Sequence, residues 1–179
     1  TEQKKVAEIL KPLMKDTRVI IGSVDQMNTY RQENFPDDGQ VLKASANYDA
    51  ANNVIFLAST KVEQVLHEMV HAATFNKVLD HYNGNTNEAV TRMEALMDEF
   101  MGLNADGARI REAQAAILRQ QAQNDPASKA AAVNEFMAYA LSNQEVGNKL
   151  RNTNTKTLVV ISRKVLQLMR RLMGGVPAT

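Results

Sequence analysis

Two histidines and a glutamate in this sequence have the spacing of a metal-binding pair with an acid beside it. The segment His67-Glu68-Met69-Val70-His71 matches H-E-x-x-H, and residues four apart on a helix project from the same face. Both imidazoles can therefore reach one ion. Zinc accepts such nitrogens and, in catalytic sites, usually adds one more protein ligand and a water. Glu68, about 100 degrees around the helix from His67, is expected to face that water.

The chemistry that such a site performs is the activation of water. A metal-bound water can have a pKa near 7, and a carboxylate beside it can take the proton and later return it to a leaving amine. We therefore predict amide hydrolysis, with Glu68 as general base and then general acid. The alternative is an ordinary helix in which neighbours or solvent satisfy these side chains. The uncharged flanks of the motif favour the metal.

A third ligand must come from elsewhere in the chain, and three residues are candidates. Glu135 lies in an otherwise apolar helix, where a lone carboxylate is expensive to bury without a partner such as a cation. Glu88 follows Asn85 at the spacing of a helix-capping box, a role that would use its carboxylate locally. His81 lies in a polar turn, where a solvated histidine is the ordinary state. We predict Glu135.

The two motifs His67-Glu68-x-x-His71 and Asn134-Glu135-Phe136-x-Ala138 together resemble the gluzincin metallopeptidases, whose third ligand is a glutamate. They are similar to lethal-factor type peptidases and to zincin-like domains embedded in very large phage virion proteins. The resemblance covers about residues 53–145. It implies one zinc ion at His67, His71 and Glu135, with Glu68 catalytic and a protein or peptide as substrate. It also implies that residues 53–59 form an edge strand that holds an extended peptide.

Tyr139 occupies a position at which the sequence departs from the family pattern. Many gluzincins place a carboxylate four residues after the ligand glutamate to orient a histidine, and Tyr139 stands there. We predict Tyr139 as a second catalytic residue that binds a ligand histidine or stabilises an oxyanion; the alternative is packing alone. Ser128 stands where lethal-factor type enzymes have a tyrosine. These departures motivate a second hypothesis, a catalytically weak or inactive zincin-like module that is structural or binds protein.

Hydrophobic spacing and turn signals predict the elements that position these residues. The segment after residue 60 is helical, with Thr60 and Glu63 as a capping box, and Ser142 with Glu145 marks another helix start. Further helices are expected at about 2–15, 87–102, 105–123, 127–141 and 157–173, and strands at 19–21, 41–46 and 53–57. The order predicts an α+β, zincin-like fold, with a small antiparallel or mixed sheet packed against a mostly helical body.

Size and composition predict one soluble domain over residues 1–179. Its 179 residues, 44% hydrophobic and 23% charged, suit a single folded core. The formal net charge of +1 gives no electrostatic attraction to nucleic acid, so none is expected as a partner. Because the chain has no cysteine, a metal must bind to nitrogen and oxygen. The nine methionines are expected in the core.

No apolar run approaches the roughly 20 residues that span a bilayer, and no signal peptide is recognisable. Membrane insertion is therefore not expected. The chain begins without methionine and ends in Gly174-Gly175-Val176-Pro177, which is typical of a linker. From these ends we predict a domain excised from a larger polypeptide, virion-associated or cytoplasmic.

Overall fold

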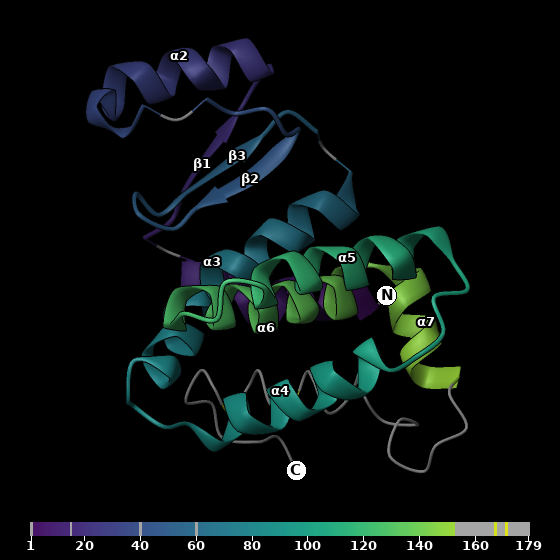
Figure 1. The fold of residues 1–179 in the computed structure, drawn as a ribbon. Coiled ribbons are helices and arrows are strands. Elements are labelled where there is room, and N and C mark those ends of the chain that lie inside the picture. The colour runs from purple at the N-terminus through teal and green to yellow at the C-terminus, as the bar shows by residue number, and fades with distance from the viewer. Residues whose placement is uncertain are drawn as a thin grey trace.

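A three-stranded mixed sheet lies between one helix on its outer face and a helical body on the other, in the computed structural model (Figure 1). The structure describes residues 2–14, 16–39, 41–59 and 61–152, together with 167 and 171. The predicted α+β class is confirmed. The α-helices are α1 (Glu2–Leu10), α2 (Val24–Asn34), α3 (Val62–Tyr82), α4 (Glu88–Met101), α5 (Ala108–Gln121), α6 (Pro126–Ser142) and α7 (Gln144–Asn152); the 3-10 helices are η1 (Lys11–Met14) and η2 (Pro36–Asp38); the strands are β1 (Arg18–Ile21), β2 (Ala46–Asp49) and β3 (Val54–Leu57).

The strand β3 occupies the centre of the sheet. It pairs in parallel with β1 and antiparallel with β2, in the order β1-β3-β2. The prediction that residues 53–59 form an edge strand is therefore wrong. All four residues of β3 are buried, which is the pattern of a strand covered on both faces and paired on both sides. The edge strand that contacts α3 is β2.

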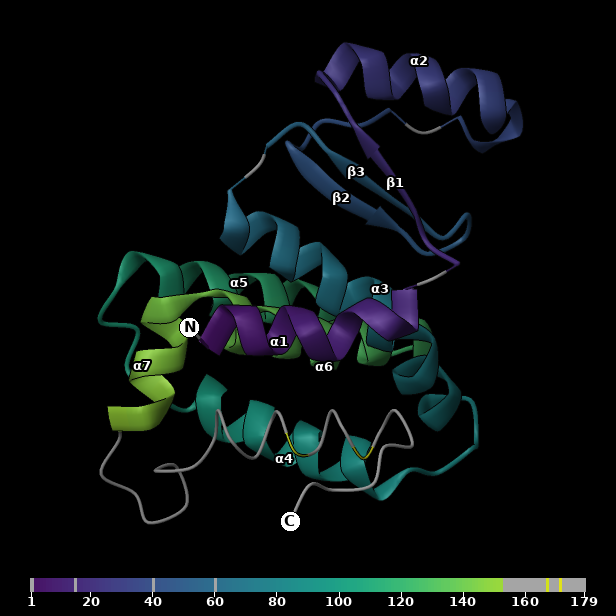
Figure 2. The same cartoon turned by 180° about the vertical axis from the view of Figure 1, so that it is seen from behind.

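Two hydrophobic clusters hold the layers together. The smaller one lies between α2 and the sheet and is built from Met27, Leu42, Val54 and Phe56. The larger one joins the helices of the body, with α3 and α6 packed along each other and α1 running against α3 on the far side (Figure 2). Met93 and Met97 are buried in this larger cluster, so the prediction that methionines fill the core is confirmed for them.

Helix α2 and the segment before β2 differ from the prediction. Residues 24–34 carry few apolar side chains, but Ser23 and Gln26 form a capping box that starts α2. The predicted strand at 41–46 is instead a loop up to Ser45. Asn28 explains this difference, because its side chain accepts from the Leu42 N–H at 2.7 Å and donates to the Leu42 carbonyl at 3.2 Å. These bonds tie the loop to α2 in place of a strand partner.

The helices of the body follow the predicted ranges closely, and their ends have local causes. Pro12 cannot continue the hydrogen bonding of α1, and the chain passes there into the 3-10 helix η1. Helix α6 begins after Asp125, whose carboxylate accepts the Ser128 N–H at 2.8 Å and caps the helix. Residue 60 of the predicted capping box and the predicted helix 157–173, apart from residues 167 and 171, lie outside the described residues.

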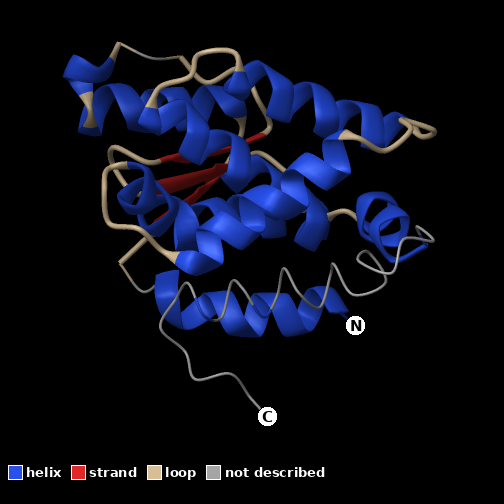
Figure 3. Ribbon diagram, turned by 60° about the horizontal axis from the view of Figure 1, so that its bottom comes forward, coloured by secondary structure: helices blue, strands red, loops and turns tan. Residues whose placement is uncertain are grey.

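The described helices include none that is both long and apolar enough to cross a membrane. Most of the described chain is helical, and the three short strands lie between helices (Figure 3). The small sheet packs against α3 through β2 and β3.

Arg31 fixes the end of β2 from inside the smaller cluster. Its guanidinium lies 2.7 Å from Asp38 and 2.8 Å from Asp49, and its exposed fraction is 3%. Asn52 donates to both carboxylates, and the Arg31 side chain also lies over the ring of Phe56. The ion pairs thus connect α2 and η2 to the last residue of β2, the strand that borders the candidate site.

Replacing Arg31 with alanine should cost about 3 kcal/mol of unfolding free energy, because the Asp49 carboxylate would remain buried without its cation. Urea denaturation of wild type and Arg31→Ala measures the loss. The matched control is Arg92→Ala, which removes an arginine whose partner is the exposed Glu88 and should cost less than about 1 kcal/mol. Equal losses in the two variants would show that the buried pair has no special weight.

Candidate metal centre

Helices α3 and α6 pack antiparallel, and their facing side chains meet in steps of four residues. Along α3 these are Glu63, His67 and His71; the matching residues are Tyr139 and Glu135 of α6 and Asn143, which caps the end of α6. Residues four apart on a helix share a face, so both helices present a polar row in a contact that is otherwise mostly apolar. The small Ala131 and Ala132 lie on the same helix α6, which permits close approach to α3.

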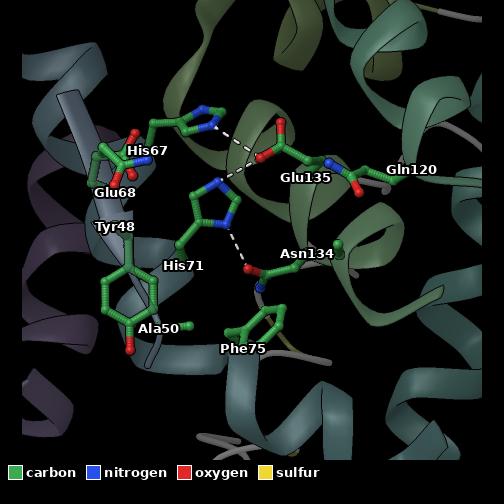
Figure 4. A pocket seen from close by; sticks show the side chains of 11 residues that line it. Tyr48, Ala50, His67, Glu68, His71, Phe75, Gln120, Asn134 and Glu135 are labelled. Carbon is green, nitrogen blue, oxygen red and sulfur yellow. Dashed lines mark hydrogen bonds and ion pairs between the residues drawn. The ribbon is translucent and has the colours of Figure 1, made fainter. Parts of the chain in front are cut away.

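His67, His71 and Glu135 form a group that could hold a metal ion. Their ligand atoms all lie within 4.8 Å of one another. One oxygen of Glu135 is 2.7 Å from Nε2 of His71 and 3.7 Å from Nε2 of His67 (Figure 4). Two ligands bound tetrahedrally at about 2.0–2.2 Å are roughly 3.3–3.5 Å apart. Small rotations of these side chains are thus enough to bring all three to one ion, and the donor set fits zinc.

Asn134 determines which nitrogen of His71 faces this group. The Thr74 hydroxyl donates to the Val70 carbonyl at 2.6 Å, which leaves its oxygen to accept from Nδ2 of Asn134 at 2.7 Å. The carbonyl oxygen of Asn134 is thereby turned toward Nδ1 of His71, at 2.5 Å. The proton of a neutral His71 then belongs on Nδ1, and Nε2 keeps its lone pair for an ion.

Sequence reasoning did not assign this role to Asn134. The signal was available, because Asn134 is a polar residue in an apolar helix, directly before the predicted ligand, and its side chain is only 1% exposed. A buried amide must find hydrogen-bond partners. The turn of α3 that carries His71 supplies them.

Without a metal, Glu135 and His71 stabilise each other's charge. Burial alone would raise the pKa of Glu135, but hydrogen bonds from His67 and His71 and their charge hold it well below its usual range. Burial lowers the pKa of His71, yet the hydrogen bond and the negative charge of Glu135 outweigh this and raise it to about 9. The His71–Glu135 ion pair therefore lies where a metal ion would bind. Such a metal ion would replace the proton that His71 carries on Nε2.

Glu68 lies beside the three possible ligands at a cavity of about 220 Å³. Its carboxylate is 8% exposed, and burial raises its pKa, while the charges of His71 and His67 and a hydrogen bond from the Tyr48 backbone N–H oppose the rise. The cavity is lined by Asn47, Tyr48, Ala50, His67, Glu68, His71, Phe75, Gln120, Ala131, Asn134 and Glu135. It has no lysine or arginine in its lining, so its charged groups are the imidazoles and two carboxylates.

Tyr139 contacts His67 but directs its hydroxyl away from the group. Its ring meets that of His67 edge to face, with centroids 4.8 Å apart and planes at 82°. The hydroxyl donates to Glu112 on α5 at 3.3 Å. Burial, followed by the charges of Glu112 and Glu135, raises the pKa of Tyr139 above its usual value, so the hydroxyl stays a donor at neutral pH. The predicted catalytic role of Tyr139 stays a prediction.

The two other candidates for the third ligand lie outside this group. Glu88 has a side chain that is 76% exposed and pairs with Arg92 one turn later on α4. The cap of α4 is Asn87, whose side chain accepts from the Ala89 N–H, so the predicted capping box is wrong. His81 accepts the Asn87 N–H at 2.7 Å on Nδ1 and closes the loop after α3. Both side chains have local partners instead.

In chemical terms, the site offers a place for one divalent ion with a protein acid beside it. Three protein ligands leave further coordination positions to solvent, and a bound ion would make a water there more acidic. Glu68 borders the same cavity and can hold a proton. Such an arrangement does not specify which bond, if any, is attacked.

A similar segment occurs in a phage protein. Over 200 aligned positions the chain is 35% identical to the virion DNA-directed RNA polymerase of Enterobacteria phage N4, and the match covers 98% of this chain. It covers 6% of that protein, so the chain spans a small part of the relative's length. No protein-family model matches the sequence, and no solved structure gives a significant match. The predicted likeness to a segment of a large phage virion protein is confirmed; a gluzincin family is not shown.

The prediction of a zinc metallopeptidase, in its active or weakened form, is wrong in light of this comparison. The relative is named as an RNA polymerase and not as a peptidase, and the predicted peptide substrate loses its support with the activity. The physical reason is that two imidazoles and a glutamate specify an ion and a polarised water, whereas the reaction depends on groups that hold a substrate. The motif alone contains no such groups.

The metal-free protein should lose stability as the pH rises from about 6.5 to about 9. His71 has a raised pKa in the folded state, so below its unfolded value both states are protonated and the ion pair contributes fully. Above about 6.5 the unfolded chain releases this proton first, which favours unfolding by up to about 3 kcal/mol. Chemical denaturation in the presence of a chelator at several pH values measures the trend.

The control for this pH dependence is Glu135→Gln, which keeps the shape of the side chain and removes the charge. Its unfolding free energy should be nearly constant over the same range, because the main cause of the raised pKa of His71 is gone. A wild-type profile as flat as that of the variant would contradict the ion pair.

Proposed function

We propose that this chain is a zinc-binding domain of a larger phage virion polypeptide, with one ion held by His67, His71 and Glu135. The observation that carries the proposal is the meeting of these three ligand atoms, within 4.8 Å, from two helices packed in the core. Because the ligands come from α3 and α6, the ion would cross-link the two helices that make the largest contact in the fold. Its binding free energy would thus add to folding.

Zinc is favoured by the donor set and by the way the histidines are presented. Imidazole nitrogen with one carboxylate oxygen is a normal zinc environment, and two histidines four apart on a helix bind it without strain. Iron(II) also uses two histidines and a carboxylate but keeps three further positions open in an octahedron. The buried Glu68 and the ring of Tyr139 crowd the group, which favours the smaller coordination number.

From the gluzincin resemblance, only the arrangement of the ligands supports this proposal. Within the arrangement, Glu68 is assigned to receive a proton from solvent at the ion, since its carboxylate lies at the same cavity and is held by the Tyr48 N–H. The ion would supply the acidity of that solvent when bound. Asn134 keeps Nε2 of His71 free for it.

The similarity to the phage N4 protein supports the proposal of a virion polypeptide in which residues 1–179 form one domain. Polymerase chemistry would lie elsewhere in such a polypeptide. Polymerases place two metal ions, about 3.5–4 Å apart, on the reacting phosphate. In the part of the chain that the structure describes, the one group that could hold a metal has two imidazoles and a single carboxylate, and its cavity has no lysine or arginine to bind a phosphate.

The purified protein should contain one zinc ion per chain and lose it in a His67→Ala/His71→Ala double variant. Metal analysis after dialysis measures the content, with zinc, iron(II) and manganese(II) offered separately to the chelator-treated protein. Added zinc should also raise the melting temperature of wild type, because an ion that binds the folded state alone stabilises it. Equal retention of all three metals, or of none, contradicts a zinc site.

Two variants serve as controls for this experiment. Glu68→Gln removes the neighbouring acid but no ligand, so zinc should be retained. Glu88→Ala removes the alternative third ligand and should leave the zinc content unchanged, whereas Glu135→Ala should lower it. Loss of zinc in Glu88→Ala with retention in Glu135→Ala would reverse the assignment of the third ligand.

A further inference from the structure

We propose that Glu112 of α5 is a positioning residue for the metal centre, acting on His67 through the hydroxyl and ring of Tyr139. This inference rests on the proposed zinc site. Glu112 itself does not contact the group; its carboxylate accepts from the Tyr139 hydroxyl at 3.3 Å, and the Tyr139 ring lies against the His67 ring. The carboxylate that orients a ligand histidine is thus provided by a third helix.

The need for such support follows from the difference between the two histidines. His71 is fixed through Nδ1 by Asn134, which is in turn fixed by Thr74. For His67, the described contacts other than Glu135 are with rings, those of His71 and Tyr139. His67 also lies farther from Glu135, at 3.7 Å. The Tyr139 ring is therefore one of the contacts that limit the orientation of the His67 ring.

Tyr139 is held at its far end by a connected set of polar side chains. Arg109 donates to the second oxygen of Glu112 at 2.8 Å and lies 3.7 Å from Glu63 of α3. Glu63 also accepts from Asn143, the residue that caps α6, at 2.7 Å. Glu63 lies one turn from His67 on α3, and Asn143 follows Tyr139 by four residues, so these contacts connect α3, α5 and the end of α6. Glu112 is the member that touches Tyr139.

The sequence position of Tyr139 explains why its side chain lies against His67. A side chain four residues after Glu135 lies one turn further along the same face of α6, at the height of His67. A carboxylate there would contact the imidazole directly. A tyrosine is too long and too apolar along its ring for that role, but it can transmit the position of a more distant carboxylate. Outer partners of ligand histidines commonly change metal affinity 10- to 100-fold.

The test compares zinc affinity, by competition with a chromophoric chelator, in Glu112→Ala, Tyr139→Phe and the double variant. Each single variant should bind zinc at least about tenfold more weakly than wild type. The double variant should be no weaker than Tyr139→Phe, because both changes break the same link. Cobalt(II) substituted for zinc should show an altered visible spectrum in both single variants, a readout that a change in fold stability alone does not move.

The matched control is Glu88→Ala, because Glu88 also pairs with an arginine on an exposed helix face but contacts no tyrosine. It should keep wild-type affinity and cobalt spectrum, and its metal-free melting temperature should change little, because its ion pair with Arg92 is exposed. Glu112→Gln keeps an oxygen acceptor for the Tyr139 hydroxyl and should restore affinity to within about threefold of wild type; this variant also serves if Glu112→Ala does not fold.

The outcomes separate this inference from the zinc site itself. Wild type that binds one zinc, with Glu112→Ala and Tyr139→Phe within twofold of it, overturns the positioning role and leaves the site intact. Wild type that binds no zinc overturns both. Equal weakening in Glu112→Ala and Glu88→Ala overturns the positioning role as well, since it would reflect the loss of any surface carboxylate.

Discussion

The partial burial of one carboxylate, that of Glu135, is the constraint on which the facing of α3 and α6 at the candidate metal centre depends. Glu135 belongs to a helix whose neighbouring residues Phe136, Met137 and Ala138 are fully enclosed. An ionised carboxylate in such surroundings is costly unless opposite charge lies close to it. The two imidazoles of α3 provide that charge. The contact of α3 with α6 brings these three side chains together at one height, and the apolar residues above and below hold the two helices against each other.

Helix α3 connects this centre to the sheet. One of its faces carries the histidines toward α6, while another contacts β2 and β3. Glu68 lies between these faces, and its carboxylate receives the backbone N–H of Tyr48 in β2. The end of β2 is fixed in turn by Arg31 from α2. The smaller hydrophobic cluster under α2 thus helps to shape the candidate metal centre, although none of the residues of that cluster lines the cavity.

Residue spacing was enough to predict the motif helix, the α+β class and the three residues that the structure brings together. His67, His71 and Glu135 were found because a buried acid needs a partner and histidines four apart share a face. Asn134 and Glu112 were not assigned, since their roles depend on side chains of other helices. The central position of β3, the loop bound by Asn28 and the polar helix α2 were not predicted for the same reason, because each depends on contacts with other elements. The reaction could not be inferred from the motif, because it depends on groups that bind a substrate.

The matched four-residue steps of α3 and α6 have a consequence for how this domain can change in length. A single residue inserted between Glu135 and Tyr139 would turn every later side chain of α6 by about 100 degrees and move it about 1.5 Å along the axis. Asn143 would then leave Glu63, and Tyr139 would leave His67. Exchange of one side chain alters one of these facing pairs, whereas an insertion or deletion shifts every pair beyond it. We therefore expect insertions and deletions to be tolerated in the loops between the helices rather than within α3 or α6.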